Sequence, residues 1–129
     1  MRKEWIICGI VLLLIGITNI ITQNYTNQSV ETMDTQLENL KQKLIQEEVE
    51  KEEVEQEFEN AMEHWKERYK ILAYYIEHDE LEKVETELTS LKGNIQVEQY
   101  EEGVPDLEKS IFILNHIKEK FKLNIKNVF

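Results

Sequence analysis

The chain has 129 residues, a length that suits one small domain, and its formal net charge is −11. A surface this acidic repels phosphate, so the composition argues against nucleic-acid binding. The single cysteine excludes an intrachain disulfide and a cysteine-based zinc site, and only four glycines and one proline favour long helices.

The first element is an apolar run at residues 5–21, WIICGIVLLLIGITNII, which carries no charge. Its residues, at ~1.5 Å each, reach about 26 Å, which is near the short limit for a spanning helix. Polar but uncharged Thr22 extends it, so the sequence predicts a transmembrane helix over 5–22. A cleaved signal peptide is the alternative, but such peptides end in small residues, and no alanine precedes Ala61.

Basic residues around this run predict its orientation. Arg2 and Lys3 lie in the short segment 1–4, and no lysine or arginine follows the run until Lys41. The positive-inside rule then places residues 1–4 in the cytoplasm and the rest of the chain outside the cell membrane.

Three residues of the run have expected roles in the membrane. Trp5 suits an anchor at the membrane–water interface. Gly9 and Gly16 are seven residues apart on one helix face, where they could seat a partner helix. Cys8 reads as a small apolar filler.

After a polar linker at 23–29, residues 30–122 show apolar positions at alternating steps of three and four. Four stripes result: Val30, Met33, Leu37, Leu40 and Leu44; Val54, Phe58, Met62, Trp65, Tyr69, Leu72 and Ile76; Leu81, Val84, Leu88, Leu91 and Ile95; and Leu107, Ile111, Leu114, Ile117 and Phe121. This spacing predicts an all-α extracytoplasmic domain, an antiparallel bundle of three or four helices. Because the stripes also read as heptads, a dimeric coiled coil is the alternative.

The breaks between the stripes differ in clarity. The phase is lost over 46–53 without a glycine or proline, so either a turn or a continuous helix fits there. The segment 101–106, EEGVPD, indicates a clear break, with Pro105 in the first turn of the next helix. If 46–53 is a turn, the hairpin order brings the junction at 74–85 and the C-terminus close to the membrane.

The junction reads YYIEHDELEKVE. Aspartate followed three positions later by glutamate predicts a capping box made by Asp79 and Glu82. Tyr74 and Tyr75 cannot both face the core, so one of them is expected to be exposed to lipid headgroups or a partner. Together with His78, they are candidate partner-binding residues.

A metal site is the competing interpretation of the same cluster. His78 and Glu82 have i, i+4 spacing but need a third ligand, for which His116 is the candidate. If 58–78 is one helix, His64 lies about 21 Å from His78 along it and cannot share a metal with it. The sequence contains no hydrolase elbow, phosphate loop or HExxH motif, so we expect no cofactor and no enzymatic activity.

The C-terminal tail at 123–129 is apolar and basic. Phe121 and Leu123 alternate with polar residues in an extended pattern, and Lys122 and Lys126 add charge. Such a tail could rest on anionic headgroups or add to a partner's sheet, so these four residues are further candidates for partner binding.

Three stretches of the sequence together resemble a known family: Trp65, YYIEHDELEKVETELTSLKG (74–93) and LNIKNVF (123–129). This pattern resembles the bacterial domain of unknown function 4363 family. The resemblance implies a single-pass membrane protein of low-GC Gram-positive bacteria, with a small multi-pass membrane protein as its partner. It implies no activity and assigns no residue roles.

These observations predict a membrane-anchored, extracytoplasmic interaction or accessory subunit. Its expected partners are the lipid bilayer, a multi-pass membrane protein or a second copy of the chain. The alternative is a ligand- or metal-sensing helical domain that uses His78, Glu82 and His116.

Overall fold

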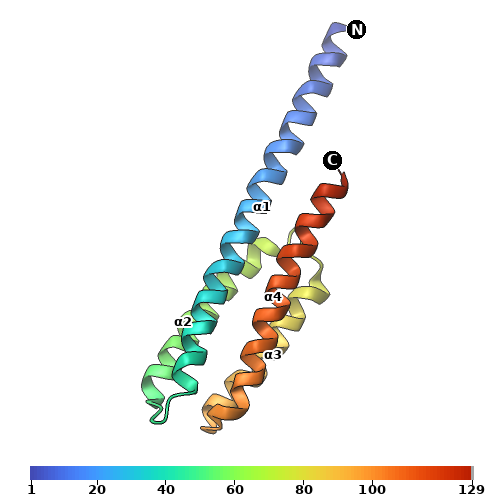
Figure 1. Cartoon of the computed structure of the whole chain (residues 1–129). Helices are drawn as coiled ribbons and strands as arrows, with labels where there is room; N and C mark the ends of the chain where they lie inside the picture. Colours follow the sequence, from blue (N-terminus) through green and yellow to red (C-terminus); the bar gives the residue numbers. More distant parts are fainter. Residues whose placement is uncertain (129) are drawn as a thin grey trace.

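The computed structural model describes the backbone of residues 1–128 and the side chains of residues 1–123. Within this range the chain forms four α-helices and no strand: α1 (Arg2–Leu44), α2 (Lys51–Leu72), α3 (His78–Gln96) and α4 (Tyr100–Val128). The helices alternate in direction and pack side by side, with α1 extending far beyond the other three (Figure 1). The predicted all-α antiparallel bundle is confirmed.

Helix α1 contains both an apolar N-terminal segment and the first helix of the bundle. Its N-terminal part contains an 18-residue window of mean hydropathy 2.4, none of it buried, which is long and apolar enough to cross a membrane. The expected linker at 23–29 is helical, so no break separates this apolar segment from the bundle. The hydroxyls of Thr22, Thr26 and Ser29 each donate a hydrogen bond to the backbone carbonyl four residues earlier. These polar side chains are therefore accommodated within the helix.

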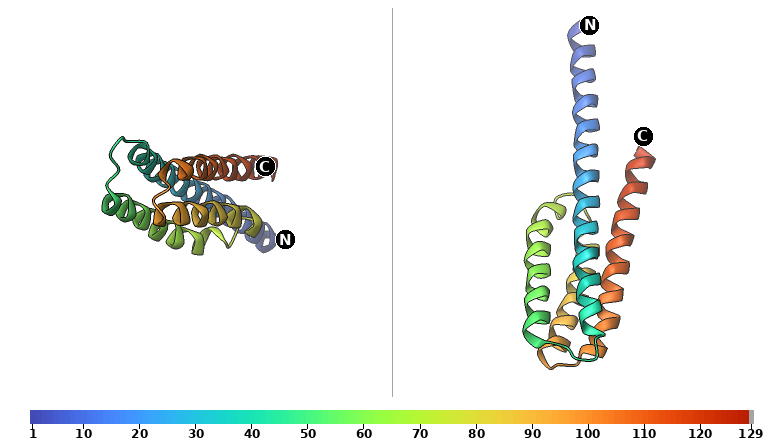
Figure 2. Two further views of the ribbon diagram at one scale, coloured as in Figure 1. Left: turned by 90° about the horizontal axis from the view of Figure 1, so that it is seen from below. Right: turned by 60° about the vertical axis from the view of Figure 1, so that its left-hand side comes forward.

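The bundle core is made by the predicted stripes. Helix α1 packs against α2 and α4, and α3 packs mainly against α4 (Figure 2). All residues of the first and third stripes are buried, as are Val54, Phe58, Trp65, Leu72, Leu107, Leu114 and Ile117 from the other two. Each fully buried leucine or isoleucine stabilises the fold by about 1.5–3 kcal/mol relative to an exposed one.

The α1–α2 connection is a real turn, although no glycine or proline marks it. Helix α1 ends at Leu44 and α2 begins at Lys51. Lys43 forms ion pairs across the turn with Glu53 and with Glu57, the latter at 2.8 Å. The interpretation of 46–53 as a continuous helix is therefore wrong.

The α3–α4 break lies earlier than predicted. It occupies residues 97–99, where Glu98 turns the chain with a φ of 60°, and α4 begins at Tyr100. Pro105 consequently lies inside α4 rather than in its first turn. The additional turn buries Gly103 and packs part of Tyr100 against the core, which offsets the backbone hydrogen bond that the proline removes.

The tail is helical where an extended segment was expected. Helix α4 continues from the core through Phe121 to Val128, so its apolar residues are helical neighbours and not alternate residues of a strand. The side chains of residues 124–129, including Lys126, lie outside the described residues.

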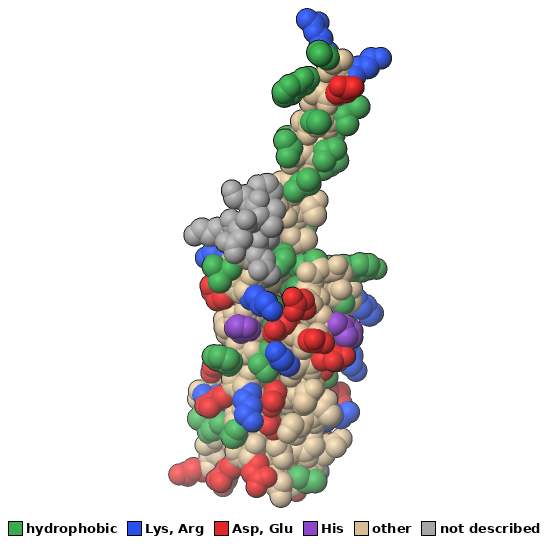
Figure 3. Space-filling view, turned by 90° about the vertical axis from the view of Figure 1, so that its right-hand side faces the viewer, with side chains coloured by type: hydrophobic (Ala, Val, Ile, Leu, Met, Phe, Trp, Pro, Cys, Tyr) green, Lys and Arg blue, Asp and Glu red, His purple; other side chains and the backbone are tan. Residues whose placement is uncertain are grey.

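The two ends of the bundle differ in position and charge. The α2–α3 connection and the C-terminal part of α4 lie at the end adjoining the apolar segment, as the hairpin order predicted (Figures 1 and 2). Acidic side chains gather at the opposite end (Figure 3), where Glu47, Glu98, Glu101 and Glu102 surround the two remaining turns.

Candidate functional site at the α2–α3 junction

The candidate site is built around residues 73–77, which connect α2 to α3. Because α3 begins at His78, we use the name junction from here on for 73–77 alone and no longer for 74–85. Helix α2 ends at Leu72, and the chain then makes a compact turn in which the Ile76 amide donates to the Leu72 carbonyl at 2.8 Å. Helix α3 begins at His78, immediately after Glu77. The junction thus has a hydrogen-bonded backbone, and its side chains point to different neighbours.

Tyr75 fastens the junction to α1. Its hydroxyl lies 2.8 Å from the hydroxyl of fully buried Thr26 and donates to the Thr22 carbonyl at 3.3 Å. Its ring packs against Phe121 of α4, with the two centroids 5.0 Å apart. Burial raises the pKa of the Tyr75 phenol, so the hydroxyl stays a neutral hydrogen-bond partner.

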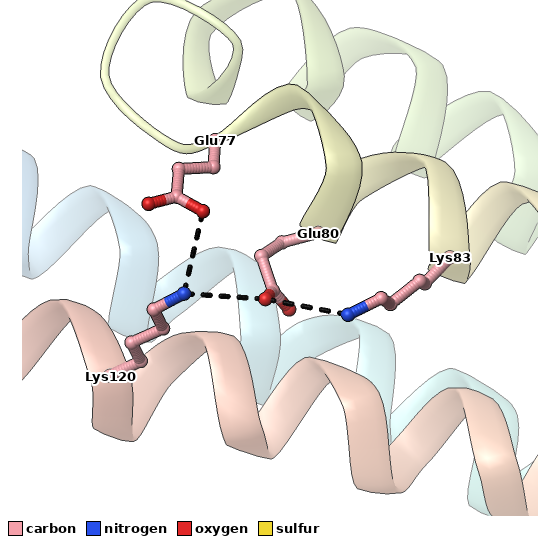
Figure 4. Close-up of polar contacts among 4 residues, drawn as sticks. All are labelled: Glu77, Glu80, Lys83 and Lys120. Carbon is pink, nitrogen blue, oxygen red and sulfur yellow. Dashed lines mark hydrogen bonds and ion pairs between the residues drawn. The ribbon is translucent and has the colours of Figure 1, made fainter.

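Lys120 fastens the junction to α4. Its ammonium lies 3.4 Å from a carboxylate oxygen of Glu77 and 3.3 Å from one of Glu80, while Lys83 approaches the same Glu80 oxygen at 3.6 Å (Figure 4). Glu80 is only 8% exposed. Burial acts to raise the pKa of Glu80, but the Lys120 hydrogen bond and the two ammonium charges outweigh it, and the pKa is lowered.

The expected capping box does not form. Because α3 begins at His78, Asp79 is already inside the first helical turn, and Glu77 occupies the N-cap without a side-chain hydrogen bond to the backbone. Glu82 instead contacts His78, with Oε1 and Nε2 3.2 Å apart. The acidic residues of this turn still favour the positive end of the α3 dipole.

His78 is part of an aromatic chain. Its ring meets Tyr69 edge-on, with centroids 6.0 Å apart, and Tyr69 meets Trp65 in the same way. His116, the third proposed ligand, stacks on Phe112 of α4. Among the residues that the structure describes, no three His, Cys, Asp or Glu side chains lie close enough to hold a metal, so the sensing interpretation gains no support from a ligand cluster.

The outer face of the junction is apolar and exposed. Tyr74 is 88% exposed, in contrast to its neighbour Tyr75, which confirms that only one of the two tyrosines faces inward. Ile71 in the last turn of α2 is 47% exposed and Leu123 of α4 is 57% exposed. Lys122 is exposed beside Leu123.

The residues that fix the junction include three that were not predicted from the sequence, Glu80, Lys120 and Thr26. A signal was present, since Glu80 is four residues before Val84 and therefore on the apolar face of α3. Thr26 likewise precedes Val30 by four. The partner of Glu80 could not be found this way, because it depends on how α4 is aligned against α3.

The predicted anchor residues are open on the surface of the apolar segment. Trp5 is 78% exposed. A Cβ added to Gly9 or Gly16 would meet nothing within 4 Å, so both glycines leave space against α1.

Comparison with known proteins adds the family. The model of the family described as domain of unknown function (DUF4363) matches residues 20–128, which include the whole bundle and the junction. Searches of curated proteins and of solved structures found no significant match. The match covers most of the chain and agrees with the resemblance seen in the sequence, so the chain belongs to the DUF4363 family.

Proposed function

We propose that this protein is a single-pass membrane protein whose bundle is a non-enzymatic interaction or accessory subunit for a membrane-embedded partner. The observation that carries the proposal is the continuity of α1, which joins an exposed apolar segment to a folded bundle within one 43-residue helix. A water-soluble protein would have to cover such a segment, whereas a bilayer covers it without further protein.

The proposed orientation places the N-terminus in the cytoplasm and the bundle outside the cell membrane. Arg2 and Lys3 precede the apolar segment, and the first basic residue after it is Lys41. This asymmetry favours retention of the N-terminal charges on the cytoplasmic side.

The apolar segment offers a surface for the partner. Gly9 and Gly16 share a helix face, and the space beside them suits close approach of a second spanning helix. Leu13 is on the same face, three or four residues from each glycine, and is 65% exposed. Val11 is on the other side of the helix and is 48% exposed.

Photo-crosslinking in native membranes tests this proposal. A photoreactive amino acid replaces Leu13 in one full-length variant and Val11 in a matched control. We expect Leu13 to give a discrete heavier adduct at native expression and Val11 to give little of it. Mass spectrometry then distinguishes a second copy of the chain from another membrane protein. Recovery of monomer alone from both variants would count against a partner.

A further inference from the structure

The junction lies at the end of the apolar segment. Tyr75 contacts Thr22 and Thr26, and Thr22 is the last residue of the predicted span. A hydrocarbon core of about 30 Å within a bilayer of about 40–45 Å leaves a headgroup layer of roughly 5–8 Å on each side. Thr26 is about 6 Å beyond Thr22 along α1, so the junction is level with that layer.

The exposed side chains of the junction end are of the kind favoured in the headgroup layer. Tyr74 is almost fully exposed, and an aromatic ring with a polar hydroxyl is favoured at the membrane–water interface. Ile71, three residues earlier in the last turn of α2, is 47% exposed and adds apolar surface. In water, both residues would expose this surface at a cost of about 25 cal/mol per Å².

The C-terminal part of α4 reaches the same headgroup layer. Phe121 packs on Tyr75, and the backbone continues as helix for seven further residues to Val128. This adds about 10 Å toward the N-terminal end of α1. The extension lies alongside the apolar segment (Figure 2), and its first residues include exposed Lys122 and Leu123.

The positive charge at the end of α4 suits the surface of an anionic membrane. From Lys120 onward the sequence of α4 has Lys120, Lys122 and Lys126 and no acidic residue, and Lys120 is paired with Glu77 and Glu80, whereas the opposite end of the bundle is acidic. A membrane surface rich in anionic lipids attracts the lysines and repels the acidic end.

We infer that the junction end is a second membrane contact, in which Tyr74, Ile71 and the first turn of α4 after Phe121 lie in the headgroup layer of the outer leaflet. The occupant is the lipid of the membrane that α1 crosses, so the inference rests on the membrane location proposed above. The bundle is then held against the bilayer at two places, by its anchor and by this end. Because Tyr75 and Lys120 hold the junction to α1 and α4, they determine how deeply Tyr74 lies in the headgroup layer.

Depth-dependent fluorescence quenching tests the contact. In full-length protein carrying Cys8→Ser, a single cysteine is introduced by Tyr74→Cys, labelled with an environment-sensitive dye, and reconstituted in vesicles of phosphatidylglycerol and phosphatidylcholine. Phe112→Cys is the matched control, because Phe112 is 72% exposed on α4 and about 14 Å farther from the membrane than Phe121. Ile21→Cys, within the apolar segment, reports insertion.

We expect lipids spin-labelled at the headgroup to quench the dye at position 74 at least threefold more strongly than at 112. Replacing phosphatidylglycerol by phosphatidylcholine should reduce the difference. Equal, weak quenching at 74 and 112 together with strong quenching at 21 would overturn the second contact and leave the anchor intact. Weak quenching at 21 as well would overturn the membrane location itself.

Discussion

Tyr74 and Tyr75 show how strongly adjacent residues can differ in role. Tyr75 is held by hydrogen bonds to α1 and by the ring of Phe121, whereas Tyr74 has nearly its whole surface exposed. The difference arises because the turn after Leu72 directs successive side chains to opposite sides. Stability should therefore depend on Tyr75, and the proposed membrane contact should depend on Tyr74.

Tyr75→Phe should lower the free energy of unfolding by about 1 kcal/mol, because it removes the hydroxyl contacts with Thr26 and Thr22 and keeps the ring. Urea unfolding of detergent-solubilised protein, followed by Trp65 fluorescence with Trp5 replaced by Phe, measures the change. Tyr74→Phe is the control and should leave the midpoint unchanged. An equal loss in both variants would refute the assigned role of Tyr75.

Glu80 should make stability depend on pH. Its pKa is lowered in the folded state, so its contribution is present above its ordinary value of 4.5 and is lost as the pH falls through the folded pKa. Glu80→Gln should cost about 1–2 kcal/mol at neutral pH, since it weakens a partly exposed charged hydrogen bond, and less at about pH 3.

The measurement is urea unfolding from pH 3 to pH 7. Glu119→Gln, at an exposed position on α4, is the matched control and should give a curve parallel to the unmodified protein. Curves for Glu80→Gln that stay parallel to the unmodified protein over this whole range would show that the carboxylate charge contributes nothing.

The positions of the bundle helices were predicted more accurately than the residues at which they begin and end. The apolar stripes located all the bundle helices, because burial imposes a helical period on the sequence. The start of α3 was misplaced by reading Asp79 as a cap, since Asp-x-x-Glu also fits inside a first turn rich in acidic residues. The start of α4 was also misplaced, because Pro105 was expected in the first turn. Packing of Gly103 and Tyr100 instead extends α4 in the N-terminal direction, so that the helix begins before Pro105.

The two bundle glycines should respond differently to alanine. Gly93 lies in α3 with nothing within 4 Å of an added Cβ, so Gly93→Ala should stabilise the protein by about 0.5–1 kcal/mol through helix propensity. At Gly103 in α4 the added Cβ would lie 3.0 Å from the Leu91 Cδ1, which opposes the same gain. Thermal unfolding of the two variants tests this, and equal gains would contradict the tight α3–α4 contact.

At the scale of the whole molecule, the sequence predicted the order of helices and the ends at which their connections lie. It could not predict the pairing of Lys120 with Glu77 and Glu80, which depends on the alignment of α4 with α3 across 40 residues or more of chain. It also gave no sign that the anchor and the first bundle helix are one element, because polar residues at 23–29 read equally as a linker.

The orientation proposed for the whole chain can be measured by cysteine labelling in intact cells. With Cys8→Ser as background, Thr89→Cys places a thiol at an exposed position of α3, and Lys3→Cys places one before the apolar segment. A membrane-impermeant maleimide should label position 89 on intact cells and position 3 only after permeabilisation. The reverse pattern would invert the topology.

Because α1 is unbroken, the bundle is joined directly to the proposed membrane anchor. Because no flexible segment intervenes after Thr22, a tilt of the anchor turns the bundle through the same angle. From Thr22 to Leu44 the helix extends about 33 Å, so a tilt of about 20° moves the acidic end sideways by roughly 11 Å. In the proposed membrane location, a change of a few ångströms in membrane thickness that alters this tilt would be converted into a larger movement at the far tip of the protein.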